Sequence, residues 1–129
     1  MAVLVDSSVW IAAASPKAKE KNILVAMIEK QELICITKLI QIEVCQGSRS
    51  EELFRRLWDS FLGFNFLDVH EDHWDRSAWN FFKCKKKGIT VTTIDCLIAT
   101  LAHDYQVPLW TLDKDFKFMQ PVIGFDIFN

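Results

Sequence analysis

Glycine, proline and long apolar runs are all scarce in this sequence. Its 129 residues include only four Gly and three Pro, while half of the residues are hydrophobic. So few chain-breaking residues argue against disordered or low-complexity linkers, and the hydrophobic share is enough for a full core. We therefore expect one compact domain over residues 1–129, and the sequence contains no visible internal repeat.

Membrane and disulfide signals are missing as well. No apolar run approaches the ~20 residues that cross a bilayer, and the N-terminus lacks the basic and then apolar order of a signal peptide. The cysteines form no Cys-x-x-Cys pair and lie in apolar or helical surroundings: Cys35, Cys45, Cys84 and Cys96. They are expected to be reduced and mostly buried. These features predict a cytoplasmic protein with no membrane partner.

Charge of one sign does not dominate either. The formal net charge is −2, which does not by itself indicate a nucleic-acid-binding protein. Positive charge gathers locally, at Arg55 and Arg56 and in the run Lys85, Lys86 and Lys87. Lysines at the end of a helix are favoured by the helix dipole and usually form a solvated surface. Contact with phosphate groups is the alternative, and both interpretations stay open for the lysine run.

Hydrophobic patterning predicts strands that alternate with helices. Short apolar runs predict strands at residues 2–5, 33–37 and 109–112, with others within 65–70 and 124–128. Helical spacing predicts helices over residues 19–32, 38–47, 50–63, 71–88 and 92–106, and the apolar face of the fourth is expected to contain Trp74, Ala78, Phe81 and Phe82. This alternation predicts an α/β fold in three layers, with helices on both faces of a central, mostly parallel sheet.

Carboxylates directly follow two of the predicted strands. Asp6 comes after the first strand, and Asp113 after the strand at 109–112, with Asp115 two residues later. Each has a purely structural interpretation. Asp6 suits the N-cap of a helix that begins near Ser8, although either Ser7 or Ser8 would serve as the cap, and the later pair suits a turn.

Two further acids lie on predicted helices. Glu43 is surrounded by apolar residues, where an unpaired carboxylate is costly. Asp95 lies in the first turn of its helix, where it would also complement the helix dipole. The residues three, four and seven positions further on are Ile98, Ala99 and Ala102, so the face that carries Asp95 is expected to be turned inward.

Together, these acids predict a metal site. The C-terminal ends of central strands and the N-termini of the following helices share one edge of a doubly wound sheet. Asp6, Asp95 and Asp113 would face that edge, and Glu43 can reach it. Converging carboxylates need a cation to offset their repulsion, and a set of oxygen ligands selects Mg²⁺ or Mn²⁺, as one or two ions, over zinc. Such a site suits metal-assisted cleavage of a phosphodiester.

Three segments also resemble the PIN domain family, and within it the VapC-like toxins of type II toxin–antitoxin systems. They are LVDSSVWI at 4–11, IEVCQG at 42–47 and TIDCLIATLAHDYQVPLWTLDKDF at 93–116. Their order and spacing fit across essentially the whole chain. The resemblance implies a PIN-like fold and a Mg²⁺- or Mn²⁺-dependent endoribonuclease that cleaves RNA to leave a 5′-phosphate and a 3′-hydroxyl.

The resemblance assigns roles to individual residues. Asp6, Glu43 and Asp95 match the three near-universal acids of the family. Asp113 and Asp115 both fall in the last matching segment, and Asp113 is preferred as the fourth acid because it directly follows the strand. The implied catalytic residues are Asp6, Glu43, Asp95 and Asp113, and the implied metal ligands are Asp6, Asp95, Asp113 and Asp115. Ser8 and Thr111 match small hydroxyl positions that support the acidic cluster.

Partners follow from the same resemblance. RNA is the implied substrate, with backbone contacts expected from Lys85, Lys86, Lys87, Arg55 and Arg56. Toxins of this kind form homodimers and receive a segment of a small antitoxin protein in a groove between early helices. The helix over 50–63 carries more aromatic and aliphatic side chains than one core face needs, which favours partner binding there. The tryptophans as a group are expected in the core or at a dimer contact rather than under stacked bases.

Two alternatives to the nuclease remain. One is a PIN-like module that binds RNA or a protein without cutting, although the full set of acids argues against it. The other is a different Mg²⁺-dependent α/β phosphohydrolase, such as a phosphatase with an Asp nucleophile after its first strand. That enzyme would normally have a second acid two residues after Asp6, where this chain has Ser8.

Overall fold

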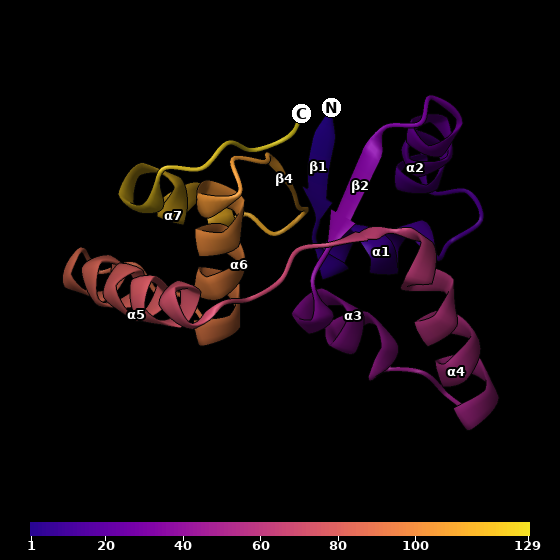
Figure 1. Ribbon diagram of the computed structural model, residues 1–129, viewed down its shortest axis with the longest axis horizontal. Helices are drawn as coiled ribbons and strands as arrows, with labels where there is room; N and C mark the ends of the chain where they lie inside the picture. Colours follow the sequence, from indigo (N-terminus) through magenta and orange to yellow (C-terminus); the bar gives the residue numbers. More distant parts are fainter.

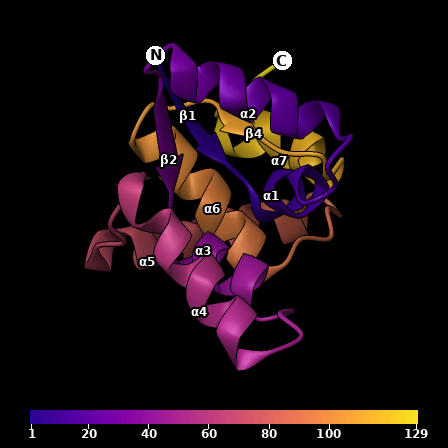
Figure 2. The same ribbon diagram turned by 90° about the vertical axis from the view of Figure 1, so that its right-hand side faces the viewer.

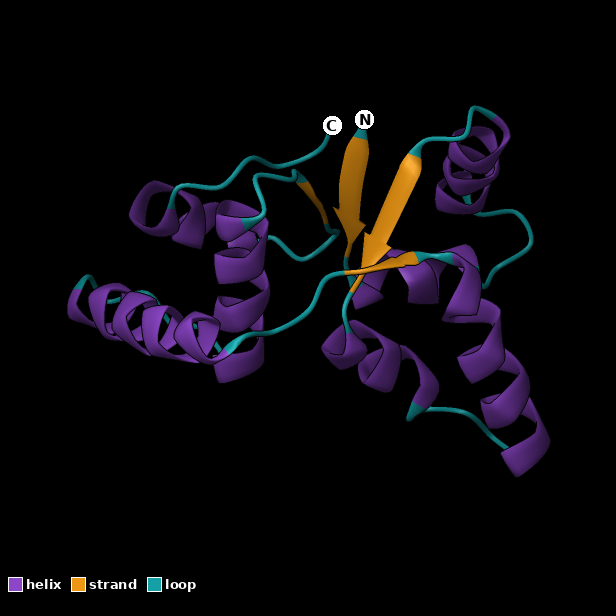
Figure 3. Cartoon of the chain, in the orientation of Figure 1, coloured by secondary structure: helices purple, strands orange, loops and turns teal.

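A central parallel sheet with helices on both faces forms the fold (Figures 1 and 3). The computed structural model describes all residues from 1 to 129. The strands are β1 (Ala2–Val5), β2 (Leu33–Ile36), β3 (Asn65–Phe66) and β4 (Leu109–Trp110), in the order β3-β2-β1-β4 and parallel throughout. The helices are α1 (Ser7–Ala13), α2 (Lys19–Glu29), α3 (Lys38–Cys45), α4 (Glu51–Ser60), α5 (Glu71–Lys86), α6 (Thr93–Asp104) and α7 (Asp115–Ile123), and a 3-10 turn covers Phe61–Gly63.

Alternating side chains of the strands feed two separate cores. Val3 and Val5 of β1 pack with Leu24 and Met27 of α2, whereas Leu4 between them belongs to the core on the opposite face. Figures 1 and 2 show the corresponding layers, with α1 and α2 on one face of the sheet and α5, α6 and α7 toward the other. The predicted three-layer α/β/α fold is therefore confirmed. By length and hydropathy, none of the helices qualifies as a membrane span.

Helices α3 and α4 lie beyond the C-terminal ends of β1 and β2 (Figures 1 and 3). Thr37, directly after β2, caps α3, because its Oγ1 accepts a hydrogen bond from the Ile40 N–H at 3.1 Å. Ser50 caps α4 in the same way through the N–H of Leu53. On the other side of the same edge, α6 begins after the capping residue Thr92, and its residues from Cys96 to Ala102 are all buried. The predicted inward orientation of that helix face is confirmed.

Two sequence-based expectations of secondary structure and burial were wrong, and one helix was not predicted. Residues 124–128 form no strand, and only an isolated bridge joins Ile127 to Leu109. The segment before it forms α7, which no pattern predicted and which contains Pro121. In α5 the buried residues are His73, Ser77 and Cys84, and of the predicted apolar face only Phe81 packs against the core, where it is half-buried. At Ser77, α5 packs closely on α6, with the Cys96 thiol 3.4 Å from the Ser77 carbonyl oxygen.

Candidate active site

Asp6 lies at the C-terminal end of β1, directly before α1. It is only 4% exposed, and its side chain makes no capping hydrogen bond to the helix. Its Oδ2 atom accepts two hydrogen bonds, from Ser8 Oγ at 2.8 Å and from Thr111 Oγ1 at 2.9 Å. The cap interpretation of Asp6 is therefore wrong, and neither Ser7 nor Ser8 replaces it, since no side chain caps α1.

The two hydroxyls that hold Asp6 are themselves held by the backbone after β4. Ser8 Oγ accepts a hydrogen bond from the Leu112 N–H at 3.0 Å, and Thr111 Oγ1 accepts one from the Asp113 N–H, also at 3.0 Å. Each backbone N–H thus occupies a lone pair of the hydroxyl and directs its O–H toward the carboxylate. Asp6 is consequently fixed between the ends of β1 and β4, with two donors on one oxygen.

Glu43 reaches the same edge from the middle of α3. Its Oε1 atom is buried and has no hydrogen-bond partner. Burial raises the pKa of this carboxyl above its usual value, and the negative charges of Asp6 and Asp95 raise that pKa further. The Ser7 hydroxyl acts in the opposite direction. Glu43 is therefore a half-buried acid whose ionised form nothing in the chain neutralises.

Asp95 occupies the first turn of α6, where its N–H donates to Thr92 Oγ1 at 3.1 Å. Burial raises the pKa of its carboxyl, against a lowering effect of Thr92. The charges of Asp6, Asp113 and Asp115 each raise that pKa as well. Mutual repulsion of this kind shows that these carboxylates lie within electrostatic reach of one another, although the sequence separates them by up to about a hundred positions.

Asp113 and Asp115 have different surroundings. Asp113 is half-buried, and its Oδ1 accepts a hydrogen bond from the Asp115 N–H at 2.9 Å, which ties the end of β4 to the start of α7. Asp115 is exposed and lines a cavity of about 270 Å³ together with Phe118 and residues 88–90. No sequence pattern indicated this cavity, because the helix that presents Phe118 was not predicted.

The donor set at this edge fits a hard divalent cation in its chemistry. It consists of carboxylate oxygens alone, one of them buried without a partner on Glu43, and the acids repel one another. As the side chains stand, no three His, Cys, Asp or Glu groups lie close enough to form a finished metal cage. The site is thus a convergence of acids, and side-chain movement would be needed to bring several oxygens onto one ion.

The predicted basic contacts lie on two different sides of this edge. Arg55 and Arg56 are on α4, where they form exposed ion pairs with Glu51 and Glu52 at 2.7 and 2.8 Å. Residues 85–87 form the exposed end of α5. Figures 1 and 2 place α4 and α5 on opposite sides of the molecule. The two basic groups therefore do not form one continuous patch.

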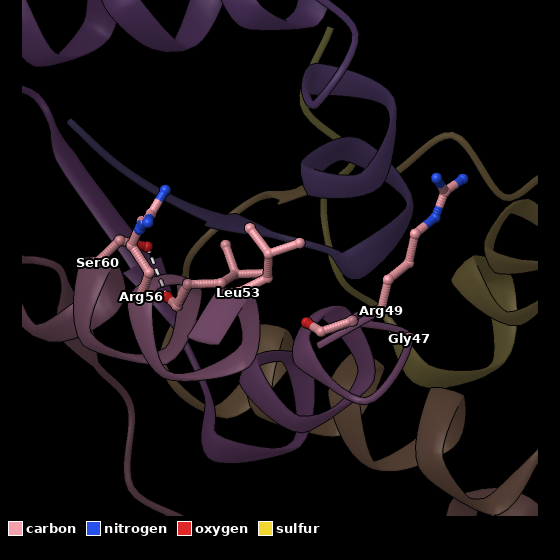
Figure 4. A pocket seen from close by; sticks show the side chains of 7 residues that line it. Gly47, Arg49, Leu53, Arg56 and Ser60 are labelled. Carbon is pink, nitrogen blue, oxygen red and sulfur yellow. Dashed lines mark hydrogen bonds between the residues drawn. The ribbon is translucent and has the colours of Figure 1, made fainter. Parts of the chain in front are cut away.

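A hollow of about 600 Å³ lies between the end of α3 and the exposed side of α4. Figure 4 shows Leu53 between the side chains of Arg49 and Arg56, with Gly47 and Ser60 at the two ends. Helix α4 buries none of its residues, and Leu53 is 46% exposed. A second hollow of about 330 Å³ next to it is lined by Glu43. An apolar groove thus leads from α4 to the acidic site.

The segments that carry these acids identify the family. Residues 3–120 match the PIN domain, and the chain belongs to this family. The family resemblance noted in the sequence is thereby confirmed. No curated protein matches the sequence significantly.

Solved structures of toxin–antitoxin proteins share the fold along the full chain. One is a chain of VapBC2 from Rickettsia felis, in a structure bound to a DNA fragment from the VapBC2 promoter. It is 19% identical with a TM-score of 0.81, and the match covers 100% of this chain and 98% of that one. A toxin–antitoxin complex from Klebsiella pneumoniae is 23% identical with a TM-score of 0.72, over 88% and 89% of the two chains. VapC20 from Mycobacterium tuberculosis, a toxin that cleaves the sarcin–ricin loop, is 12% identical with a TM-score of 0.70, over 95% of each chain.

Proposed function

We propose that this PIN domain is the toxin of a type II toxin–antitoxin pair and acts as a metal-dependent endoribonuclease in the cytoplasm. The observation that carries the proposal is the convergence of acids at the C-terminal edge of the sheet, with a buried, unpartnered oxygen on Glu43. The fold shared with VapBC structures and with the RNA-cleaving VapC20 supports it. The whole of residues 1–129 would act as one catalytic domain.

Each acid has a distinct part in the proposed reaction. A bound Mg²⁺ or Mn²⁺, as one or two ions, would supply a nucleophilic water at neutral pH and positive charge opposite the scissile phosphate. Asp6, held by two hydroxyls, offers a fixed anchoring oxygen, and Asp95 offers a second from the opposite side of the edge. Asp113, with Asp115 next to it, completes the set.

Glu43 is suited to a proton-transfer role. The pKa of Glu43 is raised from its ordinary value toward neutral pH. A carboxyl group accepts and releases protons most effectively when its pKa lies near the working pH. Its unpartnered Oε1 is free to orient the attacking water or to join the metal ligands. Ser8 and Thr111 act only through Asp6, which they position.

A cleavage assay tests this assignment. The purified protein, Mg²⁺ or Mn²⁺ and total RNA are incubated, and fragments are mapped by their 5′-phosphate ends. Asp6→Asn and Asp95→Asn should each lower the cleavage rate by more than about 100-fold, since removing a group that merely supports a metal ligand already costs 10- to 100-fold. Asp126→Asn, which changes an exposed acid after the end of α7, is the matched control. Undiminished cleavage by Asp6→Asn would show that the assignment is wrong.

The same assay discriminates the fourth acid and the competing enzyme class. Asp113→Asn and Asp115→Asn are compared, and we expect the larger loss for Asp113. Asn retains an oxygen that accepts the N–H of residue 115, so the turn before α7 should survive the first substitution. Release of phosphate from small monoesters without RNA cleavage would instead support the phosphohydrolase alternative.

The groove along α4 is the proposed antitoxin site. Phe54 and Trp58 stack at 5.7 Å between ring centroids on the exposed helix, and Leu53 lies in the adjoining hollow. An antitoxin segment with an apolar side and a basic side chain would fill the groove and bring its charge to Glu43 and the other acids. Leu53→Asp should abolish co-purification with an antitoxin encoded next to this chain and leave RNA cleavage intact.

Light scattering at micromolar concentration tests the proposed homodimer, and a monomer mass would contradict it.

A further inference from the structure

Helix α5 presents an aromatic pair that the core does not use. Trp79 is 59% exposed and Phe82 is 48% exposed, and their rings stack with 5.4 Å between centroids and an interplanar angle of 18°. One helical turn after Phe82, Lys86 places its Nζ over the Phe82 ring, 5.6 Å from the centroid. Of the two places expected for the tryptophans, the core and a dimer contact, Trp79 is therefore not in the core. Since Trp79 lies one turn before Phe82 and Lys86 one turn after it, the outer face of Trp79 is the free stacking surface.

The chain around and after this pair is mostly basic, although Asp75 lies one helical turn before Trp79. From residue 76 to residue 94 the chain contains no Asp or Glu, although acids outnumber basic residues overall, 17 to 15. The basic residues of this stretch are Arg76, Lys83, Lys85, Lys86 and Lys87, of which the last three are exposed and none of the lysines forms an ion pair. An exposed ring can stack on a base, and unpaired lysines beside it can contact phosphates. This surface therefore suits a nucleic-acid strand.

The segment that follows α5 adjoins one of the acids. The α5 helix ends at Lys86, and residues 88–90 line the cavity of about 270 Å³ with Asp115 and Phe118. Phe118 is itself 62% exposed. A few residues later the chain enters α6, which carries Asp95 in its first turn. A nucleic-acid strand that leaves the acidic site across Phe118 would therefore reach the end of α5 next.

We propose that Trp79, backed by Phe82 and Lys86, is a stacking platform for a base of single-stranded RNA that flanks the cleavage site. This inference rests on the proposed ribonuclease function. It names single-stranded RNA as the form of substrate that the enzyme holds beside its site, because only an unpaired base exposes its face for stacking. A second copy of this chain is disfavoured as the occupant, since a symmetric contact through this surface would bring two sets of lysines together.

A matched pair of tryptophan substitutions tests the platform. Trp74 lies on the same helix and is 50% exposed, but it follows the acid Glu71 by one helical turn and lies more than two turns before Lys83, so it offers a ring away from the lysines. Binding of a 5′-fluorescein-labelled, unstructured RNA of about 12 nucleotides is followed by fluorescence anisotropy in EDTA, where no cleavage occurs. Trp79→Ala should weaken binding about five- to hundredfold, the value of one stacked base, and Trp79→Phe should restore most of it. Trp74→Ala should leave binding unchanged.

The salt dependence separates stacking from charge. Lys86→Ala should lower the slope of log Kd against log salt concentration by about 0.7, the amount expected for one phosphate contact to a single strand, whereas Trp79→Ala should leave the slope unchanged. Equal binding by the Trp79→Ala and Trp74→Ala proteins, or no RNA binding by the parent, would overturn the platform. A change of mass in light scattering with unaltered RNA binding would assign the surface to a second copy and would overturn it too.

The outcomes also separate the platform from the proposed nuclease. If the parent fails to cleave RNA with Mg²⁺ or Mn²⁺ while Trp79→Ala still loses binding, the platform stands and the catalytic assignment fails. If cleavage depends on Asp6 and Asp95 while binding does not depend on Trp79, the nuclease stands and the platform fails. Because Trp79 is largely exposed, its replacement should leave thermal unfolding unchanged, which verifies that each protein is folded.

Discussion

Replacing Glu43 by Gln should stabilise the metal-free protein. The substitution keeps the shape of the side chain and removes a charge that burial, Asp6 and Asp95 all disfavour. A buried polar group without a partner costs about 1–3 kcal/mol, and more when it is charged; Gln keeps the polar atom but not the charge, and since Glu43 is only half-buried, about 1 kcal/mol is the expected gain. For a chain of this length that corresponds to a rise in melting temperature of about 3–5 °C.

The pH dependence of this gain has a definite sign. The pKa of Glu43 in the folded protein lies above its ordinary value of 4.5, so the folded state binds the proton more tightly than the unfolded chain. Below 4.5 the carboxyl is neutral in both states, and Glu43→Gln should match the parent. As the pH rises through the raised pKa, the parent loses stability relative to the variant, and the full difference is present above it.

Urea unfolding in EDTA, from roughly pH 4 to 8, measures this difference. Glu29→Gln is the control, because Glu29 is an exposed acid at the end of α2 and forms no ion pair. A Glu43→Gln protein that is less stable than the parent at pH 7, or a difference independent of pH, would refute the electrostatic reasoning. Mn²⁺ added at a hundred times its Kd for the parent should raise the parent's free energy of unfolding by about 2.7 kcal/mol. The same Mn²⁺ concentration should stabilise the variant by less.

Two further substitutions test how the two kinds of acid are held. Thr111→Val removes a hydroxyl that donates to Asp6 at 2.9 Å, so it should lower the free energy of unfolding by about 1–3 kcal/mol and slow RNA cleavage, whereas Thr111→Ser should retain both. For Asp104, burial raises the pKa, but hydrogen bonds from Arg76 and His103 bring it below its ordinary value of 3.8. Asp104→Asn should therefore cost about 1–2 kcal/mol in urea unfolding at neutral pH, with the cost fading as the pH falls toward and below 3.8, while cleavage per folded molecule is unchanged.

The strands were predictable because burial on both faces leaves a plain record in the sequence. The apolar runs at β1 and β2 have no polar side, as expected for parallel strands covered by helices on both faces. The same logic locates Asp6 and Asp113, since each acid directly follows an apolar run. Helix α7 escaped prediction because Pro121 interrupts it, although Phe116, Met119 and Ile123 recur at helical spacing and are buried.

The residues alone did not predict the contacts that set the chemistry of the site, and only the family resemblance pointed to Ser8 and Thr111 as supports of the acidic cluster. The hydrogen bond from Thr111 to Asp6 spans 105 positions, and no local pattern specifies which hydroxyl reaches which acid. The prediction of which α5 residues are buried failed for a related reason: the composition of α5 suggests an aromatic inner face, but the residues that meet α6 closely include the small Ser77 and Cys84, and Trp74 and Phe82 are exposed. Contact distances between helices depend on both partners, and the sequence of one helix does not contain them.

The chain contains two kinds of partly buried acid, and the direction of their pKa shifts indicates which acids the fold needs and which it tolerates. Asp104 joins α6 to α5 through Arg76, and these hydrogen bonds bring the pKa of its carboxyl below the ordinary value. Glu43 and Asp95 have raised pKa values because burial and neighbouring carboxylates disfavour their charge, and no cation of the chain opposes it. An acid that served only the fold would resemble the first case. The second case destabilises the folded chain near neutral pH, and a divalent cation at the sheet edge would reverse that cost. In the parent, bound metal should therefore raise stability, whereas Glu43→Gln should be more stable without metal and gain less from it. This difference distinguishes a site kept for its chemistry from one kept for its packing.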